Sequence, residues 1–82
     1  MRITYEFQTV ARCPVDDAVT IMDVTVGPTD RLIEVESILA KVRKATRQPI
    51  MQEPFTENLA QSLDATVTTV GIHSGVRITC SA

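Results

Sequence analysis

The chain has 82 residues, of which 44% are apolar and 22% charged, with eight Lys or Arg against ten Asp or Glu. A chain of this size buries only about 60% of its unfolded surface, so we expect a single domain over residues 1–82 with one thin core. The net charge of −2 argues against a protein that binds nucleic acid through its phosphates alone. No segment approaches the ~20 apolar residues of a membrane span, and the first residues do not form a basic segment followed by an apolar one. A soluble cytoplasmic protein is therefore expected.

The first quarter of the sequence predicts a β-hairpin. Residues 2–8 alternate between apolar and polar with the period of a strand, and the apolar face carries Ile3, Tyr5 and Phe7. Residues 13–17 interrupt this pattern, because Pro14 has no N–H for a strand ladder and aspartates favour turns. A second strand is predicted over residues 18–26, ended by the Gly-Pro-Thr-Asp segment at 27–30.

The middle of the chain changes to helical spacing. A helix is predicted over residues 35–45, and its apolar stripe consists of Val35, Ile38, Leu39 and Val42. A second helix is predicted to begin around Glu53 and Pro54, with a buried face of Phe55, Leu59, Ala60 and Leu63. The β-branched runs at 66–70 and 76–80 then predict a closing hairpin around the turn at 71–75.

The resulting order ββααββ predicts an α+β fold. An antiparallel four-stranded sheet with both helices on one face satisfies the short connections and covers the helices' apolar stripes. Such a sheet has two unpaired edge strands, and association of several chains into a barrel would remove them. We therefore expect a homo-oligomer.

Three polar residues are candidates for chemistry. Cys13 is either a nucleophile at the mouth of the first hairpin or a small buried residue, whereas Cys80 continues a strand alternation and is expected in the core. Glu53 could cap the second helix or accept two parallel hydrogen bonds from a guanine-like edge. His73 is the only histidine, which makes a weak case for zinc, so we expect no metal site and a polar turn residue at this position.

The segment Gln52-Glu53-Pro54-Phe55-Thr56-Glu57-Asn58-Leu59-Ala60 resembles the Gln-Glu-x-Leu-Thr-x-x-Ile-Ala stretch of tunnelling-fold enzymes, which act on purine-like and pterin-like rings. The resemblance implies ββααββ units that form barrels with active sites between subunits. It also implies that Glu53 anchors the ring, with Gln52 and His73 as further substrate-binding residues.

The segment Cys13-Pro14-Val15 resembles the start of a motif in 7-cyano-7-deazaguanine nitrile reductases. The resemblance implies that Cys13 attacks the nitrile to form a thioimide and that Asp17 is the acid, with Asp16 as a competing candidate. Within the superfamily, the sequence is closest to these reductases and to the QueF-like amidinotransferases, and more distantly similar to GTP cyclohydrolase I.

The cofactor stays open. The reductases carry two lysines for NADPH phosphates, and this chain has Glu36 and Leu39 at those positions. An archaeal branch without these lysines adds ammonia to the nitrile of a tRNA-bound base and makes an amidine. The zinc motifs of GTP cyclohydrolase I are incomplete here, because Asp16 and Gly75 stand at one histidine and one cysteine ligand position, and Val15 replaces the catalytic histidine.

The sequence therefore predicts a QueF-like enzyme that acts on the nitrile of 7-cyano-7-deazaguanine by amidation or by NADPH-dependent reduction. Two alternatives remain at this point: a purine or pterin binder without enzymatic activity, and a zinc-less protein similar to GTP cyclohydrolase. The expected partners are the small-molecule substrate and further copies of the chain. Nucleic acid is expected only if the base is modified within a polynucleotide, and no membrane is expected.

Overall fold

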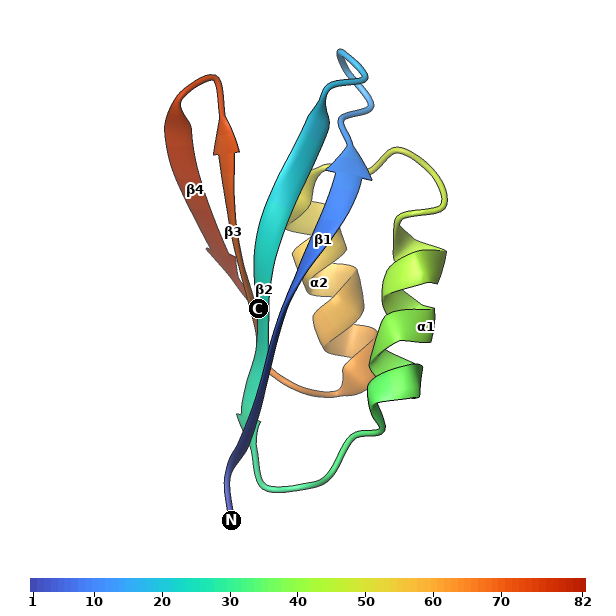
Figure 1. Cartoon of the computed structure of the whole chain (residues 1–82), viewed down its shortest axis with the longest axis vertical. Coiled ribbons are helices and arrows are strands. Elements are labelled where there is room, and N and C mark those ends of the chain that lie inside the picture. Colours follow the sequence, from blue (N-terminus) through green and yellow to red (C-terminus); the bar gives the residue numbers. More distant parts are fainter.

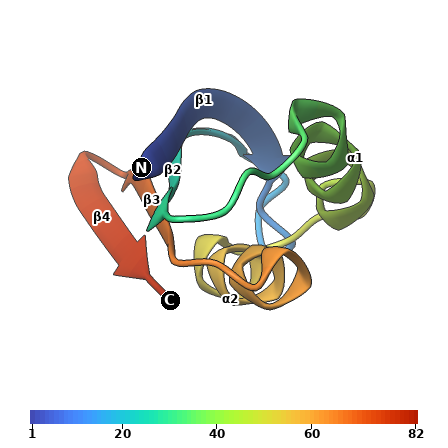
Figure 2. The same cartoon turned by 90° about the horizontal axis from the view of Figure 1, so that it is seen from below.

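The computed structural model describes residues 1–82 and confirms the predicted order ββααββ. The elements are β1 (Ile3–Arg12), β2 (Val19–Thr29), α1 (Val35–Ala45), α2 (Gln52–Leu63), β3 (Val67–His73) and β4 (Val76–Ser81). All neighbouring strands are antiparallel, and their order in the sheet is that of the sequence. Both helices lie on one side of this curved sheet (Figures 1 and 2). The α+β fold class predicted from the sequence is therefore confirmed.

The core lies between the sheet and the helices. Its fully or nearly fully buried apolar side chains come from β2, α1, α2 and β3 and include Met22, Val24, Val26, Ile38, Val42, Phe55, Leu59, Leu63 and Val67. Tyr5 and Phe7 of β1 pack against this cluster, as their alternation predicts. The stripe predicted for α1 is partly wrong, because Val35 and Leu39 are 53% and 39% exposed. The helix turns only Ile38 and Val42 fully inward, since one thin core has room for a narrow stripe.

The strands run further than the sequence patterns indicate. β2 continues through Gly27 to Thr29. Only glycine suits position 27, because its φ is +99° and a Cβ there would lie 2.7 Å from the Ile3 carbonyl oxygen. The pairing is irregular at this point and resumes at Ile3 and Thr29. β3 likewise continues through residues 71–73, so His73 is the last residue of a strand rather than part of the turn.

The closing turn is shorter than predicted. Only Ser74 and Gly75 separate β3 from β4, and both have positive φ, at 51° and 80°. Two successive positive φ angles are typical of the two-residue turns that match the twist of a hairpin. The turn is thus tight, and it brings His73 opposite Val76.

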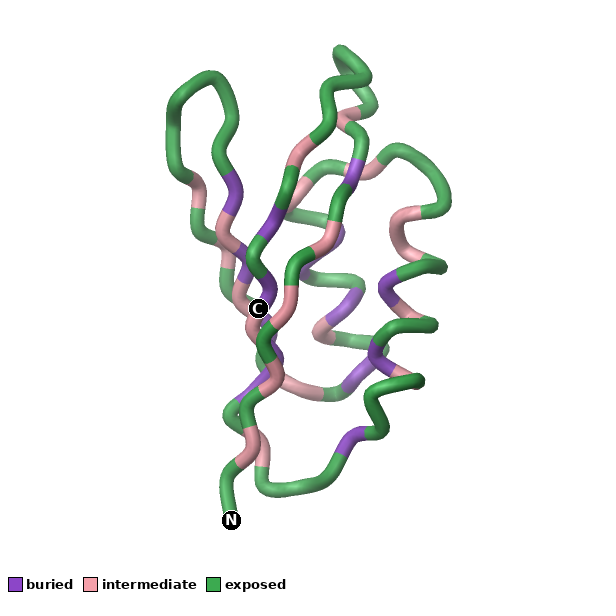
Figure 3. The backbone as a smooth tube through the Cα atoms, in the orientation of Figure 1, coloured by how far each residue is buried: buried purple, intermediate pink, exposed green.

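Three connections meet at one end of the molecule. These are the β1–β2 turn, the β3–β4 turn and the loop between α1 and α2, all at the upper end in Figure 1. Both hairpin tips are exposed, as Figure 3 shows. Polar and reactive residues of the two turns and of the loop can therefore face one another there.

The opposite face of the sheet is uncovered. Val10 and Ile21 are paired across β1 and β2 on this face and are 52% and 60% exposed, and Ile72 of β3 is 65% exposed. β1 and β4 form the two edges of the sheet. No helix in the chain has the length and apolar character needed to cross a membrane.

Candidate active site

The candidate site is a cleft of about 210 Å³ at the end of the molecule where the three connections meet. Its lining combines residues from all four strands, the β1–β2 turn, the α1–α2 loop and the start of α2: Ala11, Cys13, Val15, Asp16, Thr20, Met22, Ile50, Met51, Gln52, Glu53, His73 and Ile78. Pockets for drug-sized ligands span about 300–1,000 Å³, so this cleft suits a small ring, or one part of a site that another chain completes.

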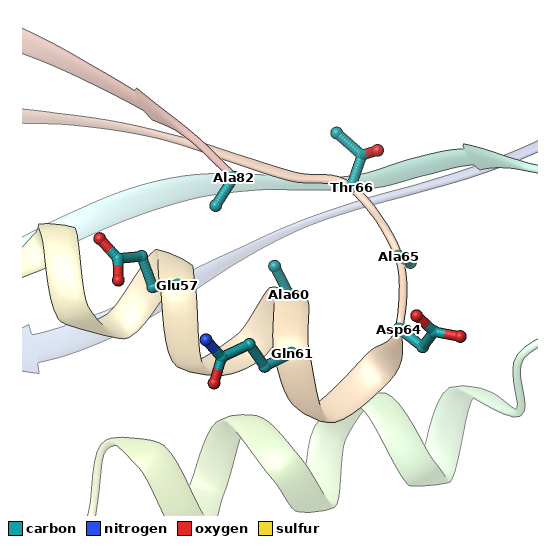
Figure 4. A pocket seen from close by; sticks show the side chains of 7 residues that line it. All are labelled: Glu57, Ala60, Gln61, Asp64, Ala65, Thr66 and Ala82. Atoms are coloured by element: carbon teal, nitrogen blue, oxygen red, sulfur yellow. The ribbon is translucent and has the colours of Figure 1, made fainter.

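A second, wider groove of about 490 Å³ lies at the other end of α2. Figure 4 shows Glu57 and Gln61 of the helix beside Thr66 and the C-terminal Ala82. This groove contains neither cysteine nor histidine. The smaller cleft brings a thiol together with two carboxylates and the histidine, and we therefore treat it as the candidate active site.

The β1–β2 turn presents Cys13 to the cleft. The Cys13 N–H donates to the Ala18 carbonyl at 2.9 Å, and the Asp17 N–H donates to the Cys13 carbonyl at 2.9 Å. Pro14 fits inside this turn because it has no N–H that needs a partner. The turn holds the half-buried Cys13 directly after the end of β1.

The turn places its two aspartates differently. Asp16 lines the cleft and accepts a 3.0 Å hydrogen bond from the Ala18 N–H. Asp17 has φ 58° and forms an exposed ion pair with Arg12, with 3.1 Å between the guanidinium nitrogen and the carboxylate oxygen. Asp17 is not among the residues that line the cleft. Of the two acids left open by the sequence, Asp16 is the one beside Cys13.

Asp16 is held in its ionised form. The hydrogen bond from the Ala18 N–H lowers the pKa of the Asp16 carboxyl below its usual value. The Cys13 thiol and the nearby His73 lower it further. Asp16 is therefore a carboxylate near neutral pH, and it lines the same cleft as Cys13.

Glu53 reaches the same cleft from the first turn of α2. The Ile50 N–H donates to the Arg12 carbonyl at 2.9 Å, which ties the loop before α2 to the end of β1. The helix has no side-chain hydrogen bond at its N-cap residue, Met51, and the Glu53 carboxylate forms no hydrogen bond or ion pair within the chain. Glu53 is exposed and lines the cleft, so its two oxygens are free to accept hydrogen bonds from a ligand.

The remaining predicted residues lie around these groups. Gln52 and His73 also line the cleft. Cys80 does not line it and is not part of the core cluster; it is half-buried on the edge strand β4, opposite Thr69. The expectation that Cys80 lies in the core is therefore wrong, because β4 lies at the edge of the sheet and α2 covers it only in part.

The chain contains no group of three or more His, Cys, Asp or Glu side chains arranged to hold a metal ion. The acids and the thiol of the cleft can instead perform nucleophilic and proton-transfer chemistry. These groups are the Cys13 thiol, the Asp16 carboxylate and the unpaired Glu53 carboxylate.

Comparison with solved structures identifies the fold. The crystal structure of the archaeosine synthase QueF-Like in its apo form superposes with a TM-score of 0.74, covering 99% of this chain and 90% of that one at 17% identity. This chain has a QueF-like tunnelling fold. No family model matches the sequence, and no curated protein sequence matches it either. The comparison bears out the resemblance in fold to the QueF-like proteins.

Two features of the site were not predicted from the sequence, and only one of them has a local signal. The bond between Ile50 and Arg12 joins segments that are distant in the chain, and no local pattern indicates it. The role of Asp16 in the turn has a local signal that can be found, because an Asp side chain commonly accepts from the N–H two residues later. That pattern would have favoured Asp16 as the residue fixed beside Cys13.

Proposed function

We propose that the protein is an enzyme that acts on the nitrile of a 7-cyano-7-deazaguanine ring through a covalent thioimide on Cys13. The observation that carries the proposal is that Cys13, Asp16 and Glu53 line one cleft. A solved structure with the same fold is an archaeosine synthase, which supports chemistry of this class. We propose that Glu53 anchors the ring and that Gln52 and His73 bind it alongside.

The proposed first step needs only the groups of the cleft. Asp16 accepts the thiol proton as the Cys13 sulfur forms a bond to the nitrile carbon, and one bond of the C≡N triple bond becomes a lone pair on nitrogen. Asp16 then returns the proton to that nitrogen. The product is a neutral thioimide, and no leaving group departs.

The second step depends on the second nucleophile. Ammonia would form a C–N bond and release the Cys13 thiol, leaving an amidine. A hydride donor such as NADPH would reduce the carbon instead. Glu36 and Leu39 supply no positive charge for cofactor phosphates, and this favours amidation.

Intact-mass measurement tests the proposal. Incubation with 7-cyano-7-deazaguanine should add the full mass of the ligand to the chain. Cys13→Ala should abolish the adduct, and Cys80→Ala, the matched control, should leave it intact. Challenge of the isolated adduct with ammonium or with NADPH then identifies the second step. Tight ring binding with no adduct on Cys13 would overturn the nitrile chemistry and favour a binding protein without enzymatic activity.

A further inference from the structure

A closed ring of hydrogen bonds ties the first turn of α2 to the sheet, and it begins and ends on Gln52. The Gln52 side-chain nitrogen Nε2 donates to the Thr69 hydroxyl at 3.1 Å, and the Thr69 and Thr56 hydroxyl oxygens are 2.6 Å apart. The Thr56 hydroxyl donates to the Gln52 backbone carbonyl at 2.8 Å. Each hydroxyl has one proton, and that of Thr56 is used on the carbonyl, so Thr69 donates to Thr56. All three donors point the same way around the ring, an arrangement in which each bond strengthens the next.

The surroundings of the ring fix the orientation of the Gln52 amide. Its Nε2 also faces the backbone carbonyl oxygens of Ile78, at 3.0 Å, and Thr69, at 3.2 Å; because Nε2 has two protons, one N–H is shared between the hydroxyl and the carbonyl of Thr69. A flipped amide would place its oxygen against these two carbonyl acceptors and would lose both hydrogen bonds. The nitrogen therefore faces these two carbonyls, and the oxygen Oε1 is at the opposite end of the amide.

The amide oxygen is left free at the cleft. Oε1 accepts no hydrogen bond within the chain, and Gln52 lines the cleft next to Glu53. It lies over Gly71, where a Cβ would be only 3.0 Å from Oε1. The absence of a side chain at Gly71 thus leaves room for the amide in this position. Thr56 and Thr69 are 1% and 0% exposed, so neither can contact a ligand in the cleft directly.

We propose that Thr56 and Thr69 are positioning residues whose hydroxyls act together with the Ile78 and Thr69 carbonyls to hold the Gln52 oxygen as a second fixed acceptor beside Glu53. The inference rests on the proposed role of Glu53 as ring anchor and deepens it. Two adjacent acceptors that cannot rotate into donors select a ring edge that presents only N–H groups, as the N1–H and 2-amino group of a guanine-like ring do. A ring that presents an acceptor at that edge, as adenine-like rings do, meets an unpaired oxygen in the cleft.

The amide orientation can be tested without a ligand. In the full chain, we expect the Gln52 side-chain NH2 to exchange slowly with solvent in a ¹H–¹⁵N NMR experiment. Thr69→Val and Thr56→Val, which remove one hydroxyl each at nearly constant shape, should speed this exchange severalfold. Thr68→Val is the matched control, because the Thr68 hydroxyl pairs with Ser81 on the exposed side of the same strands. Unchanged exchange in both core variants would overturn the ring.

Selection between rings tests the consequence. We expect calorimetry to show that the wild-type chain prefers 7-deazaguanine to 7-deazaadenine and that Thr69→Val reduces this preference about tenfold, the effect of one misplaced hydrogen-bonding group. A merely structural role would weaken both ligands by the same factor, and that result would overturn the positioning role alone. A wild-type chain that binds neither ring would overturn the proposed function and the ring selection together.

Discussion

The backbone N–H of Ile50 donates a 2.9 Å hydrogen bond to the carbonyl oxygen of Arg12. Arg12 is the last residue of β1 and precedes Cys13, whereas Ile50 lies two residues before the start of α2. The bond therefore places the first turn of α2 against the β1–β2 turn. It explains why Cys13 and Glu53, which are far apart in the sequence, line the same cleft.

The first prediction separates the two aspartates of the β1–β2 turn. Asp16→Asn should slow the formation of the Cys13 adduct by about 10²–10⁴-fold, the usual contribution of a positioned acid or base. Asp17→Asn should change the rate little, because Asp17 is paired with Arg12 outside the cleft. The measurement is a time course of adduct mass at fixed ligand concentration. If Asp17→Asn slows adduct formation and Asp16→Asn does not, Asp17 is the acid.

The pH dependence of the same reaction follows from the pKa of Asp16. The carboxylate is the form that accepts the thiol proton, and its pKa is lowered from the ordinary value of 3.8. Protonation of Asp16 should therefore reduce the adduct rate only below that pH, and no loss attributable to Asp16 is expected between pH 7 and pH 5. The Asp16→Asn variant, measured over the same range, supplies the background rate.

The second prediction concerns Glu53. If its carboxylate grips a guanine-like edge, Glu53→Gln should weaken ring binding by about 1.5–3 kcal/mol, the range for hydrogen bonds to a charged group. The melting temperature should stay nearly constant, because this carboxylate has no hydrogen-bond partner within the chain. Calorimetry and thermal denaturation measure the two effects.

The control for Glu53 is Glu57→Gln. Glu57 is an exposed acid one turn further along α2, in the wider groove rather than in the cleft. The Glu57→Gln substitution removes the same charge from the same helix and should leave the affinity for the ring unchanged. A lower melting temperature of Glu53→Gln with unchanged affinity would identify Glu53 as a residue that only complements the helix dipole.

Much of the fold follows from local patterns. The alternation in residues 2–8 and the i, i+3, i+4 spacing in the helices predict the elements, because one thin core demands one apolar face from each. The patterns fail at glycines. Gly27 and Gly71 suggest that the strands end there, yet both lie inside strands. Glycine is needed at each position for lack of space: a Cβ at Gly27 would meet the backbone, and a Cβ at Gly71 would meet the Gln52 side chain.

The site is less predictable than the fold. Cys13, Gln52 and Glu53 can be selected from their resemblance to a motif, but the choice between Asp16 and Asp17 depends on the path of a single turn. Asp17 adopts φ 58°, which directs its carboxylate toward Arg12 and leaves Asp16 at the cleft. The buried pair of Thr56 and Thr69 arises only when α2 packs on β3, so no local signal reports it.

The third prediction is self-association. β1 and β4 present unpaired edges, and the apolar side chains of Val10, Ile21 and Ile72 are more than half exposed on the uncovered face of the sheet. Unpaired edges and exposed apolar surface favour association with further copies. Light scattering at micromolar concentration should report an assembly of several chains. A stable monomer would exclude the barrel and any active site shared between subunits.

The last prediction uses the second cysteine as a reporter of the cleft. Burial raises the pKa of the Cys80 thiol, and the negative charge of Glu53 raises it further. Glu53→Gln removes that charge and should lower the pKa of Cys80, so the thiolate fraction at any given pH increases. The rate of Cys80 alkylation by iodoacetamide, followed by peptide mass spectrometry, should therefore rise at a lower pH than in the wild-type chain. The shift should be partial, because burial is the larger cause and remains in the variant. Glu57→Gln should leave the Cys80 profile in place, and an unshifted profile in Glu53→Gln would show that the Glu53 carboxylate lies too far from β4 to act on this thiol.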